Sequence, residues 1–188
     1  MTGKYNVRNY HSFIHSFGYL DVTQTTFAQV LKTSGYQTCI AGKWQLNGSK
    51  KDCNEDKFPP LRRAEHFGFD RWCLWQTVDK GRMIYQGKKT DGRYGNPVLN
   101  IDGKMTKNLI NQYGSKVILD YTLDFISENK DKPFLVYYPM ILTHCPFWPT
   151  PDSPEWKDPD RRMPRHYYRG DPNFFQTWFP TWTKWLDA

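Results

Sequence analysis

The sequence predicts an α/β fold, in which helices flank a sheet that contains parallel strands. An apolar stripe with helical spacing over residues 27–34 is followed by a short buried strand over 36–41. The same order recurs where a longer stripe over 116–129 is followed by the apolar run 134–138, which is typical of a central strand in a parallel sheet. Because helix–strand units pack with right-handed crossovers, we expect both units to share one sheet.

Local signals mark the ends of these helices. Thr25 or Thr26 can cap the first helix with its hydroxyl, and Gly35 can end it. Ser115 can cap the second helix in the same way, and Pro133 stops the segment before the second strand. The sequence therefore predicts two helices of different length, each followed at once by a strand.

The remaining segments predict loops, one further strand and a hairpin. Residues 1–24 and 47–66 are polar, without sustained periodicity, and predict loops. The apolar pattern of residues 71–75 predicts a strand. Residues 96–99 are expected to form one arm of a hairpin, with its turn over 100–103.

Two residues with useful chemistry directly follow the two predicted strands. Lys43 comes after the first strand, and His144 comes after the second. Ligands of open α/β sheets bind beyond the carboxyl ends of the strands, so we expect both residues at one site. An ammonium group can hold an oxyanion, and an imidazole can donate or transfer a proton. Taken alone, Lys43 also fits a solvated surface lysine, and His144 fits a loop histidine bonded to the backbone.

The residues around both positions resemble the sulfatase family, within the alkaline-phosphatase-like superfamily. Residues 41–48, A-G-K-W-Q-L-N-G, are similar to the family segment G-K-W-H-L-G, and residues 139–146 are similar to a segment ending in P-H-x-P. Residues 1–5 and 67–70 (F-G-F-D) also resemble family segments, and all four occur in family order. The resemblance covers about residues 1–176 and implies a partial sulfatase-like mixed sheet, truncated at both ends.

The resemblance implies roles for four residues. Lys43 would hold the sulfate group of a sulfate ester, and His144 would lie against that group, so both are expected to be catalytic. Trp44 and Gln45 are expected to bind substrate. Gln45 stands where the family has a histidine; its amide can donate a hydrogen bond, but it cannot transfer a proton.

Other features of the family do not occur in this sequence. Sulfatases bind calcium through an N-terminal Asp pair and a later Asp-Asn, and they convert a Cys or Ser in C/S-x-P-x-R to formylglycine. The sequence has no C/S-x-P-x-R segment. Its four cysteines are predicted to be small buried residues or incidental thiols. We therefore expect no metal or cofactor in this chain, and no turnover of aryl or carbohydrate sulfates by the chain alone.

Two alternative functions remain open. One is a phosphodiesterase or phosphonate hydrolase of the same superfamily, although G-K-W favours the sulfatases. The other is a non-catalytic domain that binds anions or glycans through its net charge of +7 and its 17% aromatic residues. Nucleic acid is a poor candidate because no recognition motif accompanies the charge.

The sequence says little about where the protein acts. No run is long and apolar enough to span a membrane, and no signal peptide is visible. Intact family members are commonly periplasmic or secreted, so the compartment is not predicted, and neither is the oligomeric state.

The last twelve residues differ in character from the rest. Residues 177–188 hold three of the eight tryptophans and show no helix or strand period. One possible codon series for them, shifted by a single nucleotide, translates as D-M-V-S-Y-M-D-K-M-V-G-R, which resembles the start of an amphipathic helix. We therefore expect a sulfatase-like domain over 1–176 and a frameshifted tail over 177–188; an aromatic tail that packs on the domain is the alternative.

Overall fold

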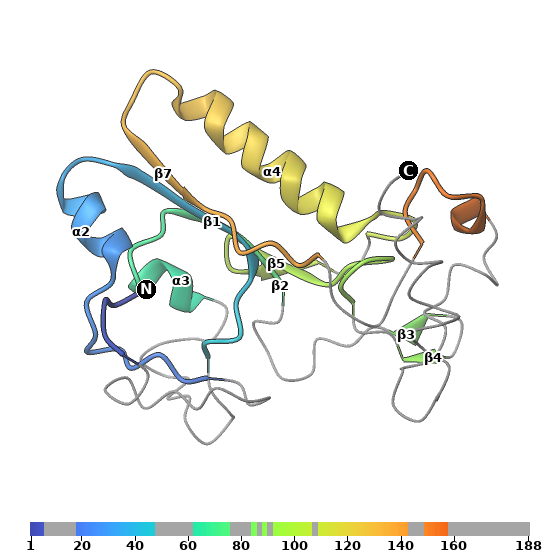
Figure 1. Cartoon of the computed structure of the whole chain (residues 1–188), viewed down its shortest axis with the longest axis horizontal. Helices are drawn as coiled ribbons and strands as arrows, with labels where there is room; N and C mark the ends of the chain where they lie inside the picture. The colour runs from blue at the N-terminus through green and yellow to red at the C-terminus, as the bar shows by residue number, and fades with distance from the viewer. Residues whose placement is uncertain are drawn as a thin grey trace.

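The computed structural model describes residues 1–5, 18–47, 62–75, 84–85, 88–89, 92–106, 109–142 and 149–157. Within this part the chain forms a mixed sheet with helices on both faces (Figure 1). The predicted α/β class is confirmed.

The sheet has five strands in the order β6-β5-β2-β1-β7. Their bounds are β1 (Gln37–Lys43), β2 (Arg71–Trp75), β5 (Leu99–Ile101), β6 (Lys104–Met105) and β7 (Phe134–Tyr137). β1 pairs in parallel with both β2 and β7, whereas β5 and β6 add an antiparallel hairpin. A separate small hairpin consists of β3 (Ile84–Tyr85) and β4 (Lys88–Lys89). Both predicted helix–strand units therefore contribute neighbouring strands to one sheet.

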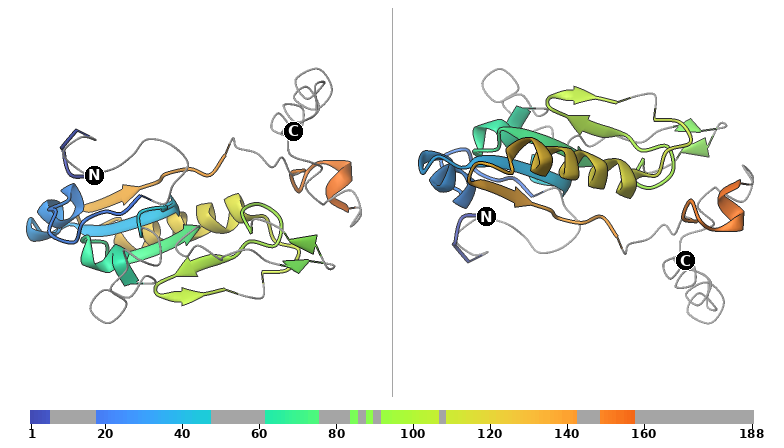
Figure 2. Two further views of the ribbon diagram at one scale, coloured as in Figure 1. Left: turned by 90° about the horizontal axis from the view of Figure 1, so that it is seen from below. Right: turned by 90° about the horizontal axis from the view of Figure 1, so that it is seen from above.

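Helices cover the two faces of the sheet. α4 (Gly114–Asn129) lies along one face, while α2 (Phe27–Thr33) and α3 (Arg63–His66) lie on the other side (Figure 2). A short 3₁₀ helix, η2 (Pro154–Lys157), lies beyond the start of α4. Among the described residues, none of the helices combines the length and the apolar character that crossing a bilayer requires.

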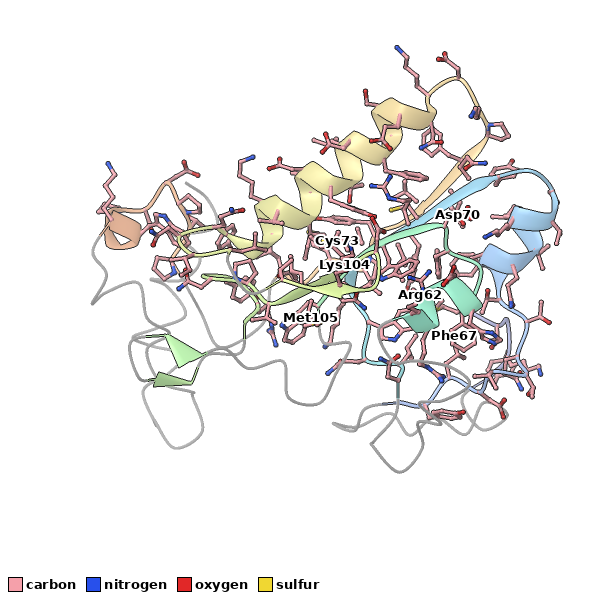
Figure 3. All side chains as sticks on the ribbon, turned by 180° about the vertical axis from the view of Figure 1, so that it is seen from behind. Arg62, Phe67, Asp70, Cys73, Lys104 and Met105 are labelled. Atoms are coloured by element: carbon pink, nitrogen blue, oxygen red, sulfur yellow. The ribbon has the colours of Figure 1, made fainter. Side chains whose placement is uncertain are left out.

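Each face of the sheet has its own apolar core. Cys73 belongs to the core between the sheet and α4, and Phe67 belongs to the core on the side of α3 (Figure 3). Because successive residues of a strand point to opposite faces, β2 supplies both cores in alternation. Cys73 and Trp75 enter the first core, whereas Trp72 and Leu74 enter the second.

The first helix begins as the sequence predicts. The Thr26 hydroxyl accepts from the Gln29 backbone N–H at 3.2 Å, and the Gln29 side chain accepts from the Thr26 N–H at 2.9 Å. This reciprocal pair is a capping box, which satisfies two backbone donors at the helix start. The helix ends at Thr33, just before Gly35, so both predicted ends are confirmed.

The prediction that Ser115 caps the second helix is wrong. α4 begins at Gly114, and its N-cap is Tyr113, which makes no side-chain capping bond. The Gly114 N–H instead donates to the Tyr94 carbonyl at 2.6 Å. A Cβ at Gly114 would lie 1.8 Å from the Arg93 carbonyl oxygen, so only glycine permits this approach. The contact with residues 93–94 starts the helix before Ser115 can act as a cap.

The hairpin is confirmed, but its turn comes later than predicted. Asn100 belongs to β5, and the turn is Asp102-Gly103, with φ of 46° and 88°. Positive φ at both central residues is typical of the tight turns that Asp-Gly favours between antiparallel strands. The Asn100 side chain accepts from the Gly103 N–H at 3.0 Å, which holds the turn against the strand.

The position of β7 also differs from its prediction. Its apolar sequence predicts a central strand, but within the described residues β7 pairs only with β1 and lies at the edge of the sheet. Its residues are partly exposed, and Tyr137 is 37% exposed.

The F-G-F-D segment fastens the start of β1. The Asp70 carboxylate accepts from the Thr38 backbone N–H at 3.0 Å and from its hydroxyl at 2.8 Å. Lys32 at the end of α2 lies 2.5 Å from the other carboxylate oxygen. Partial burial alone would raise the pKa of Asp70, but the hydrogen bonds from Lys32 and Thr38 outweigh it, so the pKa lies below its usual value.

We expect Asp70→Asn to lower the free energy of unfolding at pH 7 by about 1–3 kcal/mol, because hydrogen bonds to a charged acceptor are lost. The folded pKa of Asp70 is depressed, so its stabilisation is complete above the usual value of 3.8 and is lost as the pH falls through the folded value. Urea unfolding of the full chain between neutral and acid pH measures this. Asp120→Asn, which removes an exposed ion pair with Lys116, is the control and should change stability by less than about 1 kcal/mol. Equal losses in both variants would contradict the prediction.

Candidate functional site

Lys43 is the last residue of β1, at the carboxyl edge of the parallel strands. Its register partner is Trp75, the last residue of β2. Paired residues of neighbouring parallel strands point to the same face, so Lys43 and Trp75 both lie on the face that α4 covers. Lys43 is half-buried there. The structure therefore places Lys43 where ligands of α/β sheets bind, as predicted.

Gly42 brings the segment after β7 directly against β1. The Lys43 backbone N–H donates to the Pro139 carbonyl at 2.8 Å. Gly42 has a φ of 134°, and a Cβ at this position would lie 2.0 Å from the same carbonyl oxygen. The glycine before Lys43 is thus required by the close passage of residues 139–142. That segment leads to His144, which lies outside the described residues, so the approach of His144 to Lys43 stays a prediction.

Arg93 lies beside Lys43, on the same face of the sheet. Its guanidinium carbon is 4.2 Å from the centre of the Trp75 ring and 5.5 Å from the Tyr94 ring. The residue is only 6% exposed. Burial lowers the pKa of Lys43, and the positive charge of Arg93 lowers it further. Two cations are therefore held close together at the edge of the sheet.

The neighbouring tyrosine ties this region to the segment after β7. The Tyr94 hydroxyl donates to the Ile141 carbonyl at 2.9 Å. Tyr94 also stacks on Tyr113, with ring centres 6.0 Å apart, and Trp156 of η2 packs edge-on against Tyr113. Arg93 and its aromatic neighbours are thus fixed to the start of α4 and to residues 139–142.

Trp44 is buried on the opposite side of the sheet from Arg93. It is 4% exposed and packs in the core that contains Phe67. Its indole N–H donates to the Asn47 side chain at 2.5 Å. These contacts give Trp44 a packing role, and a contact with substrate stays a prediction.

Gln45 is half-buried and has a backbone conformation that is unusual for its type. Its φ is 52°, in the left-handed region, which costs a residue with a Cβ about 1–2 kcal/mol. Residues held in this region often lie at functional sites, where the surrounding structure fixes them. The contact of Gln45 with substrate likewise stays a prediction.

The described cysteines are structural. Cys39 and Cys73 are free thiols, and both are fully buried. Burial raises the pKa of Cys39 to about 12 and raises that of Cys73 as well, so neither is a nucleophile at neutral pH. The prediction of small buried residues is confirmed for this pair; Cys53 and Cys145 lie outside the described residues.

The described residues do not fit a calcium site. A metal site needs at least three His, Cys, Asp or Glu side chains close together, and the described part of the chain contains no such group.

A comparison of the sequence with models of protein families shows which family this chain belongs to. A family model described as Sulfatase matches residues 1–170. The chain belongs to the sulfatase family. Similar sulfatases include an N-acetylglucosamine-6-O-sulfatase of Bacteroides thetaiotaomicron, 28% identical over 153 residues. Arylsulfatase G of Rattus norvegicus is 27% identical over 177 residues, and each match includes 80% of this chain.

A solved structure shares the fold of this sulfatase chain. It is a complex with its substrate D-glucosamine-2-N,6-O-disulfate, is 25% identical, and has a TM-score of 0.53 over 80% of this chain. This chain covers 24% of that structure, 22% of the Bacteroides relative and 32% of the rat relative. It therefore spans about a fifth to a third of the length of these three proteins.

Of the residues in this region, Arg93 is the one that sequence reasoning missed. The predicted residues 43–45 stand in a recognisable motif, whereas Arg93 follows Asp91-Gly92 within a stretch that predicts only turns. Its stacking on Trp75 joins segments far apart in the chain. No local signal in the sequence indicates that contact.

We expect Gly42→Ala to lower the free energy of unfolding by on the order of 3 kcal/mol or more, because the new Cβ collides with the Pro139 carbonyl at a strained φ. Gly35→Ala is the matched control: φ there is also positive, at 86°, but no atom lies within 4 Å of the added Cβ. Urea unfolding should give a clearly smaller loss for Gly35→Ala. Equal losses would show that the approach of residues 139–142 is not the reason for Gly42.

We expect Lys43→Met to raise the thermal midpoint at pH 7, because the folded protein no longer has to bury an ammonium beside Arg93. The folded pKa of Lys43 lies below its usual 10.5, so wild-type stability recovers as the pH rises from the folded value towards 10.5. The difference between the two proteins should therefore shrink at high pH. Lys104→Met, at an exposed position on β6, is the control and should leave the midpoint unchanged. A lower midpoint for Lys43→Met than for Lys104→Met would contradict this prediction.

Proposed function

We propose that Lys43 binds the sulfate group of a sulfate ester at the carboxyl edge of β1. The observation that carries this proposal is the position of Lys43, which ends β1 with its backbone N–H bonded to Pro139. The segment 139–142 brings the chain towards His144 from the other neighbouring strand. An ammonium at this point offsets negative charge on sulfate oxygens and on a departing alkoxide.

His144 and Gln45 are the proposed partners of Lys43. An imidazole at His144 donates to ester oxygens and helps to protonate the leaving oxygen. The Gln45 amide donates a hydrogen bond but supplies neither charge nor proton. The packing of Trp44 keeps the turn after β1 in place, and we propose that it acts on substrate through that turn.

The parent reaction is hydrolysis of a sulfate ester, and a carbohydrate sulfate is the favoured substrate class. The N-acetylglucosamine-6-O-sulfatase relative and the neighbour that binds a sulfated glucosamine support this choice. The sequence has no C/S-x-P-x-R segment, from which family members form the formylglycine nucleophile. We therefore propose that the chain by itself binds sulfated ligands without turning them over.

We expect the full chain to bind glucosamine 6-sulfate, and Lys43→Met to weaken binding by about tenfold or more, because a charged hydrogen bond is lost. Isothermal titration calorimetry measures this, with Lys104→Met as the control of equal net charge. Unchanged affinity in Lys43→Met would sink the proposal. Tighter binding of a phosphate diester than of a sulfate ester would favour the phosphodiesterase alternative.

A parallel assay with 4-nitrophenyl sulfate tests the predicted lack of turnover. The wild-type chain should release no 4-nitrophenol above the rate of a buffer blank. Robust release that Lys43→Met abolishes would show that the chain contains a complete active site. Binding without release fits the proposal, and it fits the non-catalytic glycan-binding alternative equally.

A further inference from the structure

We propose that Arg93 is a second anion-binding residue of the Lys43 site, and that its guanidinium contacts the same sulfate group. This inference rests on the proposed function, because it assumes that Lys43 binds the anion. Neither the G-K-W motif nor the segment that contains His144 includes Arg93. The case for Arg93 comes from the position, the burial and the fixed orientation of its side chain.

Arg93 lies next to the strand that pairs with the end of β1. Lys43 and Trp75 are register partners at the ends of adjacent parallel strands, so their side chains stand next to each other on one face. The Arg93 guanidinium lies 4.2 Å from the centre of the Trp75 ring. Arg93 therefore reaches the carboxyl edge of the sheet at the strand beside Lys43.

The Arg93 side chain is buried. Arg93 is 6% exposed, and taking a charged group out of water is costly unless other groups stabilise it. The faces of Trp75 and Tyr94 contribute to that stabilisation. Lys43 adds a repulsive contribution, which its lowered pKa also reflects. An anion bound beside both cations would be attracted to each of them and would offset the repulsion between them.

The orientation of the Arg93 guanidinium is restricted by its aromatic neighbours. Stacking on Trp75 fixes the plane of the guanidinium, so its N–H donors point along defined directions. A planar fork of donors can bind two oxygens of a tetrahedral anion, whereas the Lys43 ammonium acts as a point charge. Together the two side chains match an anion with several terminal oxygens, such as the sulfate group of an ester.

The backbone that carries Arg93 is held firmly. The Gly114 N–H donates to the carbonyl of Tyr94, and the absence of a Cβ at Gly114 lets Arg93 approach the start of α4. The Tyr94 hydroxyl donates to the Ile141 carbonyl, in the segment that leads to His144. Arg93 is thus anchored to α4 and to the chain on the far side of Lys43, as a residue that must hold a ligand in a fixed geometry should be.

Calorimetric titration of the full chain with sodium sulfate, at constant ionic strength, tests the inference. We expect Arg93→Gln to weaken sulfate binding by about tenfold or more, because a charged donor is lost. Arg93→Lys keeps the charge but loses the planar pair of donors, so its affinity should lie between those of Arg93→Gln and wild type. Arg62→Gln is the matched control, since Arg62 also lies over a tryptophan of β2, with its guanidinium carbon 5.8 Å from the Trp72 ring centre. Trp72 belongs to the core on the other face of the sheet, so this variant should bind as wild type does.

The pH dependence separates an effect of the Arg93 charge on the Lys43 site from a loss of folded protein. Sulfate affinity should fall as the pH rises through the pKa of Lys43, and Arg93→Gln should move this midpoint to higher pH. Among the described residues, Arg93 is the charged group that acts on Lys43, and the nearby Tyr138 is neutral because burial raises its pKa. A loss of folded protein alone would reduce the amplitude of binding without moving the midpoint.

A wild-type measurement covers the case in which Arg93→Gln does not fold. The side-chain Nε–H resonance of Arg93, assigned by its absence in Arg93→Lys, should shift with the sulfate binding curve. The corresponding Arg62 resonance should not shift. Equal affinities for Arg93→Gln and Arg62→Gln, or an unmoved Arg93 resonance in saturating sulfate, would overturn the inference.

The controls also separate this inference from the proposed function. Wild-type binding that Lys43→Met abolishes but Arg93→Gln leaves intact would overturn the role of Arg93 alone. If Lys43→Met binds sulfate as wild type does, the proposed function fails and the role of Arg93 fails with it.

Discussion

The parallel pairing of β1 with strands on both of its sides is the interaction on which the rest of the structure depends. β1 is bonded to β2 on one side and to β7 on the other, and its carboxyl end is where Lys43 lies. Parallel strands need long crossovers, so residues at their carboxyl ends come from distant parts of the sequence. Residues 43, 75 and 139 meet at one edge for this reason. The Asp70 carboxylate fastens the other end of β1, so the strand is fixed at both ends.

Much of the fold could be predicted from local sequence. The capping box at Thr26 and the alternation in β2 depend on neighbouring residues only, and both helix–strand units are where the periodicity places them. The start of α4 and the turn at Asp102 were misplaced because contacts from elsewhere in the chain decide them. The bond from Gly114 to Tyr94 determines the first case, and the Asn100 side chain stabilises the second. Apolar composition suggested a central position for β7, but composition alone does not specify the neighbours of a strand.

In the candidate site, too, local sequence predicts some residues, whereas contacts between distant segments determine others. Lys43 could be found because a family motif surrounds it, and the structure gives that motif a physical reason: Gly42 has no Cβ and so allows Pro139 to pass. Arg93 could not be predicted as a site residue because its position depends on stacking with Trp75, which is distant in the sequence and belongs to β2. The chain also spans only 22% of the Bacteroides sulfatase that it matches.

The two buried thiols give the sheet an internal reporter. Cys39 and Cys73 lie on the adjacent strands β1 and β2, and neither side chain is accessible to solvent. A thiol reagent can therefore reach them only when these strands separate or the covering helix lifts. The rate at which Cys39 and Cys73 themselves become labelled measures how often the centre of the sheet opens, and both positions should become reactive in the same opening event. The protein thus carries a natural probe of the cooperativity of its parallel strand pair, without any engineered label.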